Sequence, residues 1–457
     1  MRTPRLLPVT AAAVAAAVLT ACGGVHGRPG GSGVRDPYFP KAGNGGYDVS
    51  HYDLVLAYEP DRQRLTGTAK ITARATQDLS AFDLDLKGLD VASVAVDGRD
   101  VRFHRAGQEL TVRPAEDLDD GDRFEVTVRY SGVPETITDP DGSREGWLRT
   151  ADGALALGQP VGSMAWFPGN HHPSDKATYE VAVTVPKGLR AVSNGEPAGE
   201  RTVNDRTTYT WRTEEPMASY LATVAVGTWR VSRSRTGDGL PVYTAVDPEQ
   251  AAGAGVLKRI PEVVEWGEGL FGPYPFSSVG AIVDRPADVD YALETQNRPV
   301  FPGAPDIVLL VHELAHQWYG DSVTPKTWRD MWLNEGFATY AEWLWQEDHG
   351  GDTAQEIFET TYAEDVVWAF PPADPPDAAH LTAAPVYQRG AMVLHRIRQL
   401  VGDTAFRSLL RGWAAAHRHG NADTDDFVAY VERSAPDEDF TGVWEDWLRG
   451  DGKPARP

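Results

Sequence analysis

The sequence predicts a multidomain α+β protein with a β-rich N-terminal domain followed by a mainly α-helical domain. Residues 47–231 contain short runs in which apolar and polar side chains alternate, separated by Gly, Pro and Asp. Residues 232–457 contain longer stretches in which apolar residues recur with helical spacing. The 457 residues are enough for two or three domains with a sizeable core.

The first residues have the pattern of a signal peptide. Two arginines precede an apolar, alanine-rich run over 6–21, which is short for a membrane span. The run ends in a string that resembles a bacterial lipobox, and its Cys22 is the only cysteine of the chain. We therefore expect a signal peptide over 1–22 and an extracytoplasmic lipoprotein, anchored to the membrane by a lipid on Cys22. Simple secretion is the alternative. The glycine-rich residues 23–46 are expected to be a flexible tether.

Residues 47–231 are expected to form an antiparallel, β-sandwich-like domain. Apolar and polar residues alternate strictly over 82–86 and over 124–130, as expected for strands with one buried face. Asp97-Gly98 separates two short β-rich runs, which predicts a hairpin because both residues tolerate a positive φ. Short turns rich in Gly, Pro and Asp connect such strands in sandwich folds.

Residues 232–457 are expected to form the second domain, which is mainly helical with a small sheet. The run over 279–283 is wholly apolar apart from one glycine, as expected for a buried strand. Besides the two helices of the metal motif described below, helical patterns cover residues 256–270, 391–401, 405–415, 425–434 and 440–448. Pro261 must lie near an end of the helix predicted over 256–270, or kink it.

Charge narrows the classes of function. The chain has 43 Lys and Arg against 66 Asp and Glu, which gives a formal net charge of −23. Proteins that bind nucleic acids usually carry a basic patch, whereas this sequence has no basic stripe and no alternation of basic and aromatic residues. We therefore expect no nucleic-acid partner.

The string His312-Glu313-Leu314-Ala315-His316 lies in an apolar stretch of helix length. Histidines four residues apart share one face of a helix, so both imidazoles can reach one ion. Zinc accepts two such nitrogens and a carboxylate oxygen, and keeps a fourth position for water. Glu313 is placed to act as a base on that water. An ordinary buried helix with two hydrogen-bonded histidines is the alternative interpretation.

Glu335 supplies the third ligand. It lies in a second predicted helix over 331–342, and a short turn separates the two helices. Helices joined in this way can face each other and place Glu335 at the metal. We therefore predict one zinc ion per chain, bound by His312, His316 and Glu335. Glu342, two turns further along, is expected to lie near the site or in solvent rather than to bind the ion.

With this metal motif, the chain resembles peptidase family M1, the gluzincins of aminopeptidase N type. The spacing between the histidines and Glu335 matches the family, and the resemblance extends from Tyr47 to Trp447. It implies an N-terminal β domain followed by a thermolysin-like catalytic domain. Longer members carry an additional helical domain after the catalytic one, so the chain resembles a short form of the family.

The resemblance implies roles for three further residues. Glu294 falls on the glutamate of the family motif Gly-Ala-Met-Glu-Asn, which binds the free α-amine of the substrate. Gln159 falls on a second amine-binding position. Tyr387 falls on the tyrosine that stabilises the oxyanion of the transition state. Tyr291 replaces the first glycine of the family motif, which alters the floor of the substrate pocket.

These assignments predict a zinc-dependent aminopeptidase that hydrolyses the N-terminal peptide bond by Glu-assisted attack of zinc-bound water. Its expected partners are peptides with a free N-terminus. Glu313 and Tyr387 are the expected catalytic residues, and Glu294 and Gln159 the expected amine-binding residues. A zinc endopeptidase of the same fold is one alternative, and Glu294 argues against it. A non-catalytic cell-surface binding protein derived from a peptidase is the other, and the intact metal motif argues against that.

Overall fold

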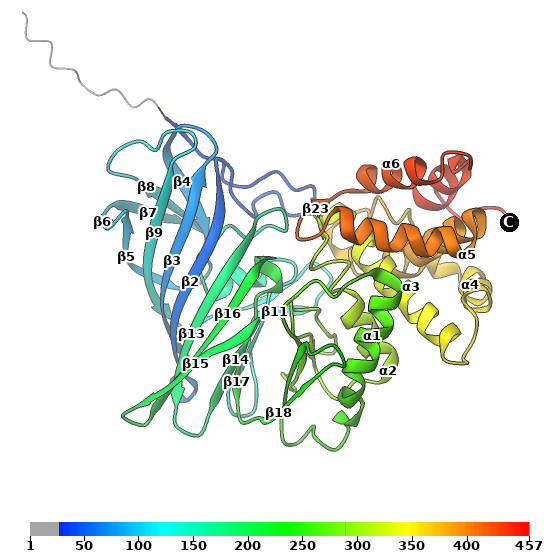
Figure 1. Cartoon of the computed structure of the whole chain (residues 1–457). Helices are drawn as coiled ribbons and strands as arrows, with labels where there is room; N and C mark the ends of the chain where they lie inside the picture. The colour runs from blue at the N-terminus through cyan, green and yellow to red at the C-terminus, as the bar shows by residue number, and fades with distance from the viewer. Residues whose placement is uncertain (1–26, 288, 457) are drawn as a thin grey trace, which may run out of the picture.

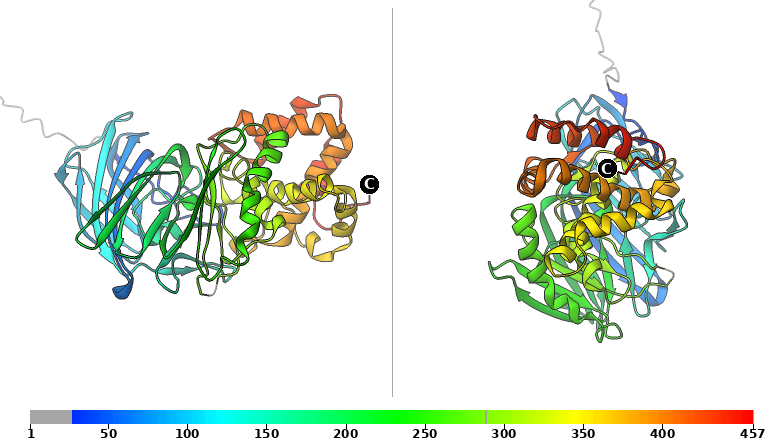
Figure 2. Two further views of the ribbon diagram at one scale, coloured as in Figure 1. Left: turned by 60° about the horizontal axis from the view of Figure 1, so that its bottom comes forward. Right: turned by 90° about the vertical axis from the view of Figure 1, so that its right-hand side faces the viewer.

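The computed structural model describes residues 27–287 and 289–456. Strands occupy one end of the molecule and helices the other, as Figures 1 and 2 show. This arrangement confirms the predicted α+β class and the order of its two parts. Within the described ranges, no helix is both long enough and apolar enough to cross a lipid bilayer.

The N-terminal domain is built on an eight-stranded sheet. Its central strands alternate buried and exposed residues along their length, so one face packs into the core and the other meets solvent. Neighbouring strands are antiparallel except β2 and β13, which are parallel. In spatial order the strands are β15 (Glu196–Val203), β16 (Arg206–Ala218), β13 (Lys176–Pro186), β2 (Tyr47–Glu59), β3 (Arg64–Ala75), β9 (Arg123–Gly132), β5 (Asp90–Val96) and β6 (Arg99–Asp100).

Two smaller sheets complete this domain. A four-stranded sheet contains β1 (Arg28–Pro29), β4 (Leu79–Asp85), β8 (Glu109–Arg113) and β7 (Arg102–Ala106). A five-stranded sheet contains β10 (Thr136–Thr138), β11 (Arg144–Arg149), β12 (Ala154–Leu157), β17 (Val224–Gly227) and β14 (Arg190–Ser193). The loop between β10 and β11 reaches the second domain, where Thr382 Oγ1 donates to Asp141 Oδ2 at 2.8 Å.

The hairpin predicted at Asp97-Gly98 forms, but its second strand is short. Asp97 and Gly98 have φ of +49° and +75°, and β5 pairs with β6 across them. After Asp100 the chain leaves this sheet, and β7 pairs with β8 in the four-stranded sheet instead. The β-rich run that follows Asp97-Gly98 in the sequence therefore continues as a strand, β7, although of the neighbouring sheet.

Residues 27–46, predicted to be part of a flexible tether, pack against both domains. β1 pairs with β4, and Tyr38 Oη donates to the backbone oxygen of Pro375 at 2.7 Å. Asp36 is 2% exposed and accepts a hydrogen bond from the backbone N–H of Trp328 at 2.9 Å. Side chains of the segment therefore bond to backbone groups far along the chain and hold it in place despite its glycine-rich sequence. The predicted lipid-anchored Cys22 lies outside the described residues.

The second domain begins with a small mixed sheet. Its strands are β18 (Arg230–Arg235), β19 (Pro241–Val246), β20 (Val279–Val283) and β21 (Val300–Phe301). Because β18 belongs wholly to this sheet, the domain junction lies between Gly227 and Arg230, slightly before the predicted boundary at 231. A Cβ at Gly280 would lie 1.7 Å from the backbone oxygen of Tyr243, so the contact between β19 and β20 requires glycine there.

Helices cover this sheet and form the far end of the molecule (Figure 1). Pro261 lies in the first turn of its helix, where its missing N–H costs nothing. The two patterns predicted over 391–401 and 405–415 form one long element, which is broken at Gly402, where φ is +76°. The helices are α1 (Ile260–Phe271), α2 (Ile307–Ala315), α3 (Trp332–Asp348), α4 (Ala354–Ala363), α5 (Gly390–Ala416) and α6 (Thr424–Ser434).

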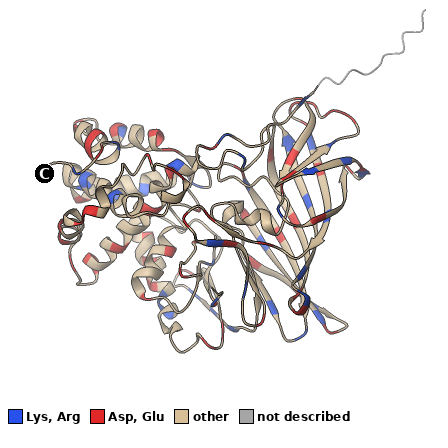
Figure 3. Cartoon of the chain, turned by 180° about the vertical axis from the view of Figure 1, so that it is seen from behind, with Lys and Arg blue, Asp and Glu red and all other residues tan. Residues whose placement is uncertain are grey.

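Seen from behind, the acidic and basic residues are distributed over both domains. Figure 3 shows Lys and Arg scattered among Asp and Glu on strands and helices alike. The core is continuous between the domains, because one cluster of buried apolar side chains extends from the N-terminal sheets to α5 and α6. The helices of the second domain are therefore held on a single packed scaffold.

Candidate active site

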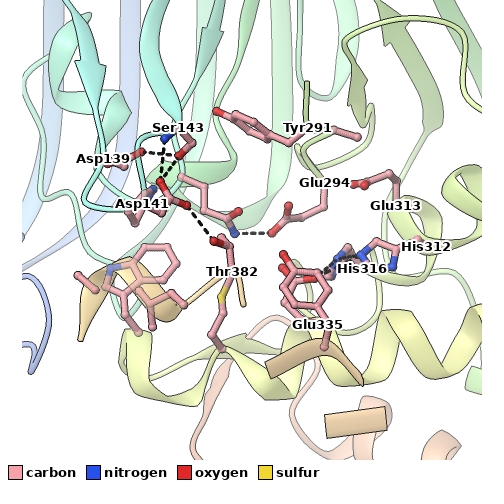
Figure 4. Close-up of a pocket in the computed structure, with 18 of the residues that line it drawn as sticks. Asp139, Asp141, Ser143, Tyr291, Glu294, His312, Glu313, His316, Glu335 and Thr382 are labelled. Atoms are coloured by element: carbon pink, nitrogen blue, oxygen red, sulfur yellow. Dashed lines mark hydrogen bonds and ion pairs between the residues drawn. The ribbon is translucent and has the colours of Figure 1, made fainter. Parts of the chain in front are cut away.

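The predicted metal ligands lie together between α2 and α3. His312 Nε2 and His316 Nε2 are 3.1 Å apart, and each lies 3.3 Å from Glu335 Oε2. All three residues are buried. His316 caps α2, one position after its last helical residue, and Glu335 is in the first turn of α3. We call these three residues the metal cluster; Figure 4 shows them on one side of a cavity.

The spacing of the metal cluster fits a zinc ion. A tetrahedral ion with bonds of about 2.0–2.1 Å holds its ligand atoms about 3.3 Å apart. His312 Nδ1 lies 2.6 Å from Glu342 Oε1, and His316 Nδ1 lies 3.0 Å from the backbone oxygen of Tyr319. Since both partners are acceptors, the Nδ1 atoms carry the protons and the Nε2 lone pairs face each other. Two nitrogen lone pairs and a carboxylate oxygen at this distance repel one another unless a cation lies between them, so this arrangement indicates a metal site.

Glu342 lies beside the site rather than among the ligand atoms, as the sequence predicts. Its carboxylate holds the ring of His312 and selects the tautomer that leaves Nε2 free. Tyr319 does the same for His316 through its backbone oxygen. These two acceptors therefore orient both imidazoles towards one point.

Glu313 faces the same cavity. It is 4% exposed, and its Oε2 has no hydrogen-bond partner among the described residues. Burial raises the pKa of Glu313 to about 8, so this carboxyl group can take up and release a proton near neutral pH. A buried carboxylate oxygen without a protein partner indicates a place for a water molecule or a substrate group.

Tyr387 lies beside the metal cluster and lines the same cavity. It belongs to the π-helical turn Pro385–Arg389 that precedes α5, and its ring stacks on that of His312, with centroids 6.1 Å apart and planes 12° apart. Burial and the nearby carboxylates, Glu335 first, raise the pKa of Tyr387 well above its usual value. The hydroxyl group therefore keeps its proton and can donate a hydrogen bond.

A pair of glycines brings Tyr387 to Glu335. A Cβ on Gly336 would lie 2.9 Å from the carbonyl carbon of Gly390, so the backbones of α3 and α5 touch at this point. Gly336 follows Glu335 directly, and Gly390 comes three residues after Tyr387. Arg389 fixes the same turn, because its buried guanidinium donates to the backbone oxygens of Trp447, Asp446 and Phe370.

Gln159 and Glu294 come from different domains and meet in the cavity. Gln159 Nε2 donates to Glu294 Oε1 at 2.7 Å. Glu294 lies in the segment between β20 and β21, and its backbone oxygen accepts from Gln317, just after the metal helix, at 3.1 Å. Asn194 of the N-terminal domain also holds this segment, through the backbone oxygen of Gln296 at 2.8 Å. We call Gln159 and Glu294 the amine pair.

The cavity that joins these groups has a volume of about 500 Å³. It contains all seven site residues that the sequence analysis proposed, namely Gln159, Glu294, His312, Glu313, His316, Glu335 and Tyr387. Several lining residues carry no signal in the sequence, because they come from the N-terminal segment, the loop between β10 and β11, the turn that leads into α3, and the segment before Tyr387. The main ones are Phe39, Asp139, Asp141, Trp328, Met331 and Leu381.

Comparison with known proteins agrees with this geometry. Residues 306–447 match the model of the peptidase family M1 domain, and residues 49–221 match the peptidase M1 N-terminal domain. Among curated proteins, Probable aminopeptidase 2 of Sulfurisphaera tokodaii is 24% identical over 89% of this chain and 54% of its own length. Aminopeptidase N of Lactobacillus helveticus is 27% identical over 89% of this chain and 51% of its own length. The chain thus spans about half the length of these curated relatives.

Solved structures match over nearly the whole chain. A two-domain M1 zinc metallopeptidase variant bound to L-arginine superposes with a TM-score of 0.87 and 31% identity, over 93% of this chain and 99% of that one. A variant of the M1 zinc metallopeptidase from Deinococcus radiodurans, bound to a Tyr-Ser-Ala substrate, gives a TM-score of 0.85 and 30% identity over the same shares. The metal cluster, the two matched domains and these full-length structural matches show that the chain belongs to peptidase family M1.

Proposed function

We propose that this protein is a zinc-dependent aminopeptidase that removes the first residue from peptides with a free N-terminus. The contact between Gln159 and Glu294 beside the metal cluster carries this proposal. Glu294 is 3% exposed and has no cationic side chain among the described residues that line the cavity. The α-ammonium group of a peptide would supply the missing charge and hydrogen-bond donors.

The amine pair determines which peptide bond of the substrate lies at the metal cluster. Glu294 and the oxygen of Gln159 accept hydrogen bonds from the ammonium group, which fixes the first residue of the substrate. The first peptide bond then lies over the metal cluster, and a reacting group held in this way reacts far faster than a free one. An endopeptidase has no use for a buried carboxylate at this position.

A zinc ion and two side chains, Glu313 and Tyr387, would carry out the remaining chemistry. Zinc, when held by His312, His316 and Glu335, supplies a Lewis acid that polarises the water nucleophile and the scissile carbonyl. Glu313 takes a proton from the water and later passes it to the leaving amine. The Tyr387 hydroxyl group donates a hydrogen bond to the oxyanion that forms as the carbonyl is attacked.

A ladder of peptides that share one N-terminal residue, each with and without N-acetylation, tests the proposal. Free peptides should be shortened one residue at a time, and acetylated peptides should react much more slowly. Glu294→Ala should remove most of that difference, because the ammonium group then gains little over a blocked amine. Glu249→Ala, which removes an exposed carboxylate outside the cavity, is the matched control.

The alternatives give different results in the same assay. Equal cleavage of free and blocked peptides, or first cuts at internal bonds, would indicate an endopeptidase. Peptide binding without turnover by the zinc-loaded protein would indicate a binding protein.

A further inference from the structure

The cavity continues beyond the amine pair to a wall from the N-terminal domain. Asp139, Asp141 and Ser143 belong to the loop between β10 and β11, and all three line the cavity. Figure 4 shows them on the side of Glu294 that faces away from the metal cluster. Because the scissile carbonyl lies at the metal cluster, the first side chain of a substrate has this wall as its nearest surface.

Asp139 is a buried carboxylate at this wall. It is 8% exposed, and its side chain accepts a hydrogen bond from the fully buried carboxyl group of Glu145. Burial raises the pKa of both groups, of Asp139 to about 6 and of Glu145 well above its usual value. Glu145 therefore keeps its proton, and the negative charge near neutral pH lies on Asp139.

Asp141 supplies a second charge. It accepts hydrogen bonds from the backbone N–H of Ser143 at 2.9 Å, from Ser143 Oγ at 2.6 Å and from Thr382 Oγ1 at 2.8 Å. Burial raises its pKa, but the hydrogen bonds from Ser143 and Thr382 outweigh that effect, and the pKa is lowered overall. These neutral partners fix the carboxylate without neutralising it. Among the described residues that line the cavity, none is Lys or Arg.

Apolar side chains line the same cavity. Phe39 and Trp328 make an edge-to-face contact with ring centroids 6.2 Å apart, and Met331 and Leu381 also line the cavity. A side chain that suits both surfaces has an apolar stem and a cationic end, which describes lysine and arginine. Aromatic faces add a favourable surface for a cation.

We propose that this cavity selects peptides whose first residue is arginine or lysine, with Asp139 and Asp141 as the specificity-determining residues. The inference rests on the proposed aminopeptidase function. A cationic end at the wall would neutralise two carboxylates that repel each other, in a cavity whose described lining contains no Lys or Arg. A neutral side chain of the same shape fills the same space but leaves that repulsion in place.

Coumarin amides of four amino acids test this inference on the zinc-loaded chain. Arginine is compared with citrulline, which has nearly the same shape without the charge, and lysine with norleucine. We expect kcat/KM to be at least about tenfold higher for each cationic member, a difference typical of one buried charge-assisted contact. Asp139→Asn and Asp141→Asn should each lower the arginine-to-citrulline ratio severalfold, and Asp141→Lys should bring it to one or below.

Glu116→Gln removes an exposed charge that pairs with Arg99 on another face, and it should leave the ratio unchanged. Should Asp139→Asn fail to fold, the two Asp141 variants decide, since Asp141 lies on an exposed loop. Equal turnover of arginine and citrulline amides, or a ratio that the Asp141 variants do not change, would overturn the inference while leaving an aminopeptidase. Hydrolysis of none of the four amides would overturn the proposed function itself, and the inference with it.

Discussion

Asp36 fastens the N-terminal segment to the catalytic domain, and Asp36→Ala measures what this contact contributes. Its Oδ1 accepts from the backbone N–H groups of Tyr38 and Phe39 at 2.8 and 3.0 Å. Its Oδ2 accepts from the backbone N–H of Trp328 at 2.9 Å and from His172 Nε2 at 3.2 Å. The backbone N–H of Ser174 donates to His172 Nδ1, so the ring proton is on Nε2 and points to Asp36.

How deeply the four donors are buried determines how much stability Asp36→Ala should remove. Tyr38 and Phe39 are half-buried, so their backbone N–H groups can turn to water when the carboxylate is removed. Trp328 is 1% exposed and His172 is 4% exposed, so both of their donors would lose their partner in the interior. Each such loss costs about 1–3 kcal/mol. We therefore expect Asp36→Ala to lower the free energy of unfolding by about 2–6 kcal/mol.

Urea denaturation of the variant and the parent chain measures this difference. Asp61→Ala, on an exposed turn of the same domain, should change the free energy of unfolding by less than about 0.5 kcal/mol. Because Phe39 and Trp328 line the cavity, KM for peptides should also rise in Asp36→Ala. A loss below about 1 kcal/mol, with an unchanged KM, would refute the reasoning.

The stability that the Asp36 hydrogen bonds contribute should depend on pH. Burial raises the pKa of Asp36, but the hydrogen bonds from His172, Trp328 and the turn residues outweigh it, so the folded pKa lies below the usual 3.8. A carboxyl group with a lowered folded pKa adds stability above its unfolded pKa, and loses it as the pH falls through the folded pKa. The stability difference between parent and Asp36→Ala should therefore be full above about pH 4 and shrink in more acidic solution.

Further predictions concern the metal cluster, the catalytic groups and the N-terminus. Chelation should abolish activity and zinc should restore it, and metal analysis of Glu335→Ala should find little bound zinc; an active, metal-free protein would contradict this. Glu313→Gln and Tyr387→Phe should both keep zinc, with the second losing about 10²–10³ in kcat, the usual cost of one oxyanion donor; a change confined to KM would mean that Tyr387 binds substrate only. We also propose a lipid anchor on Cys22, so fractionation should find Cys22→Ser released from membranes or left unprocessed, and a parent chain that is wholly soluble would contradict it.

Short-range patterns in the sequence predicted most of the fold and the metal cluster. Histidines four residues apart on one helix must share a face, and Glu335 follows on the next helix, so local geometry already brings these groups together. Strand and helix patterns likewise depend on neighbours in the chain. Gln159 and Glu294, in contrast, are 135 residues apart, and only the family resemblance pointed to their proximity.

The prediction for the N-terminal segment failed for a physical reason. A glycine-rich composition indicates a chain with many accessible conformations, which is why residues 23–46 were expected to be a tether. Asp36 overrides this preference through partners 136 and 292 residues away, and no local pattern encodes such contacts. The sequence analysis also missed Asp139 and Asp141 at the cavity wall. Both have the composition of ordinary turn residues, and their cavity partners lie far away in the chain.

Charge balance connects the metal, the amine and the first side chain of the substrate. Seven residues with carboxyl groups line the cavity, and its described lining contains no Lys or Arg to offset them. A dication offsets Glu335, an α-ammonium group offsets Glu294, and a cationic side chain offsets Asp139 and Asp141. These positive groups reinforce rather than oppose one another, because each neutralises different carboxylates of the cavity and so lowers the electrostatic repulsion among those that remain. By the same argument, a peptide that begins with Asp or Glu would bring an eighth carboxylate to the wall and bind poorly.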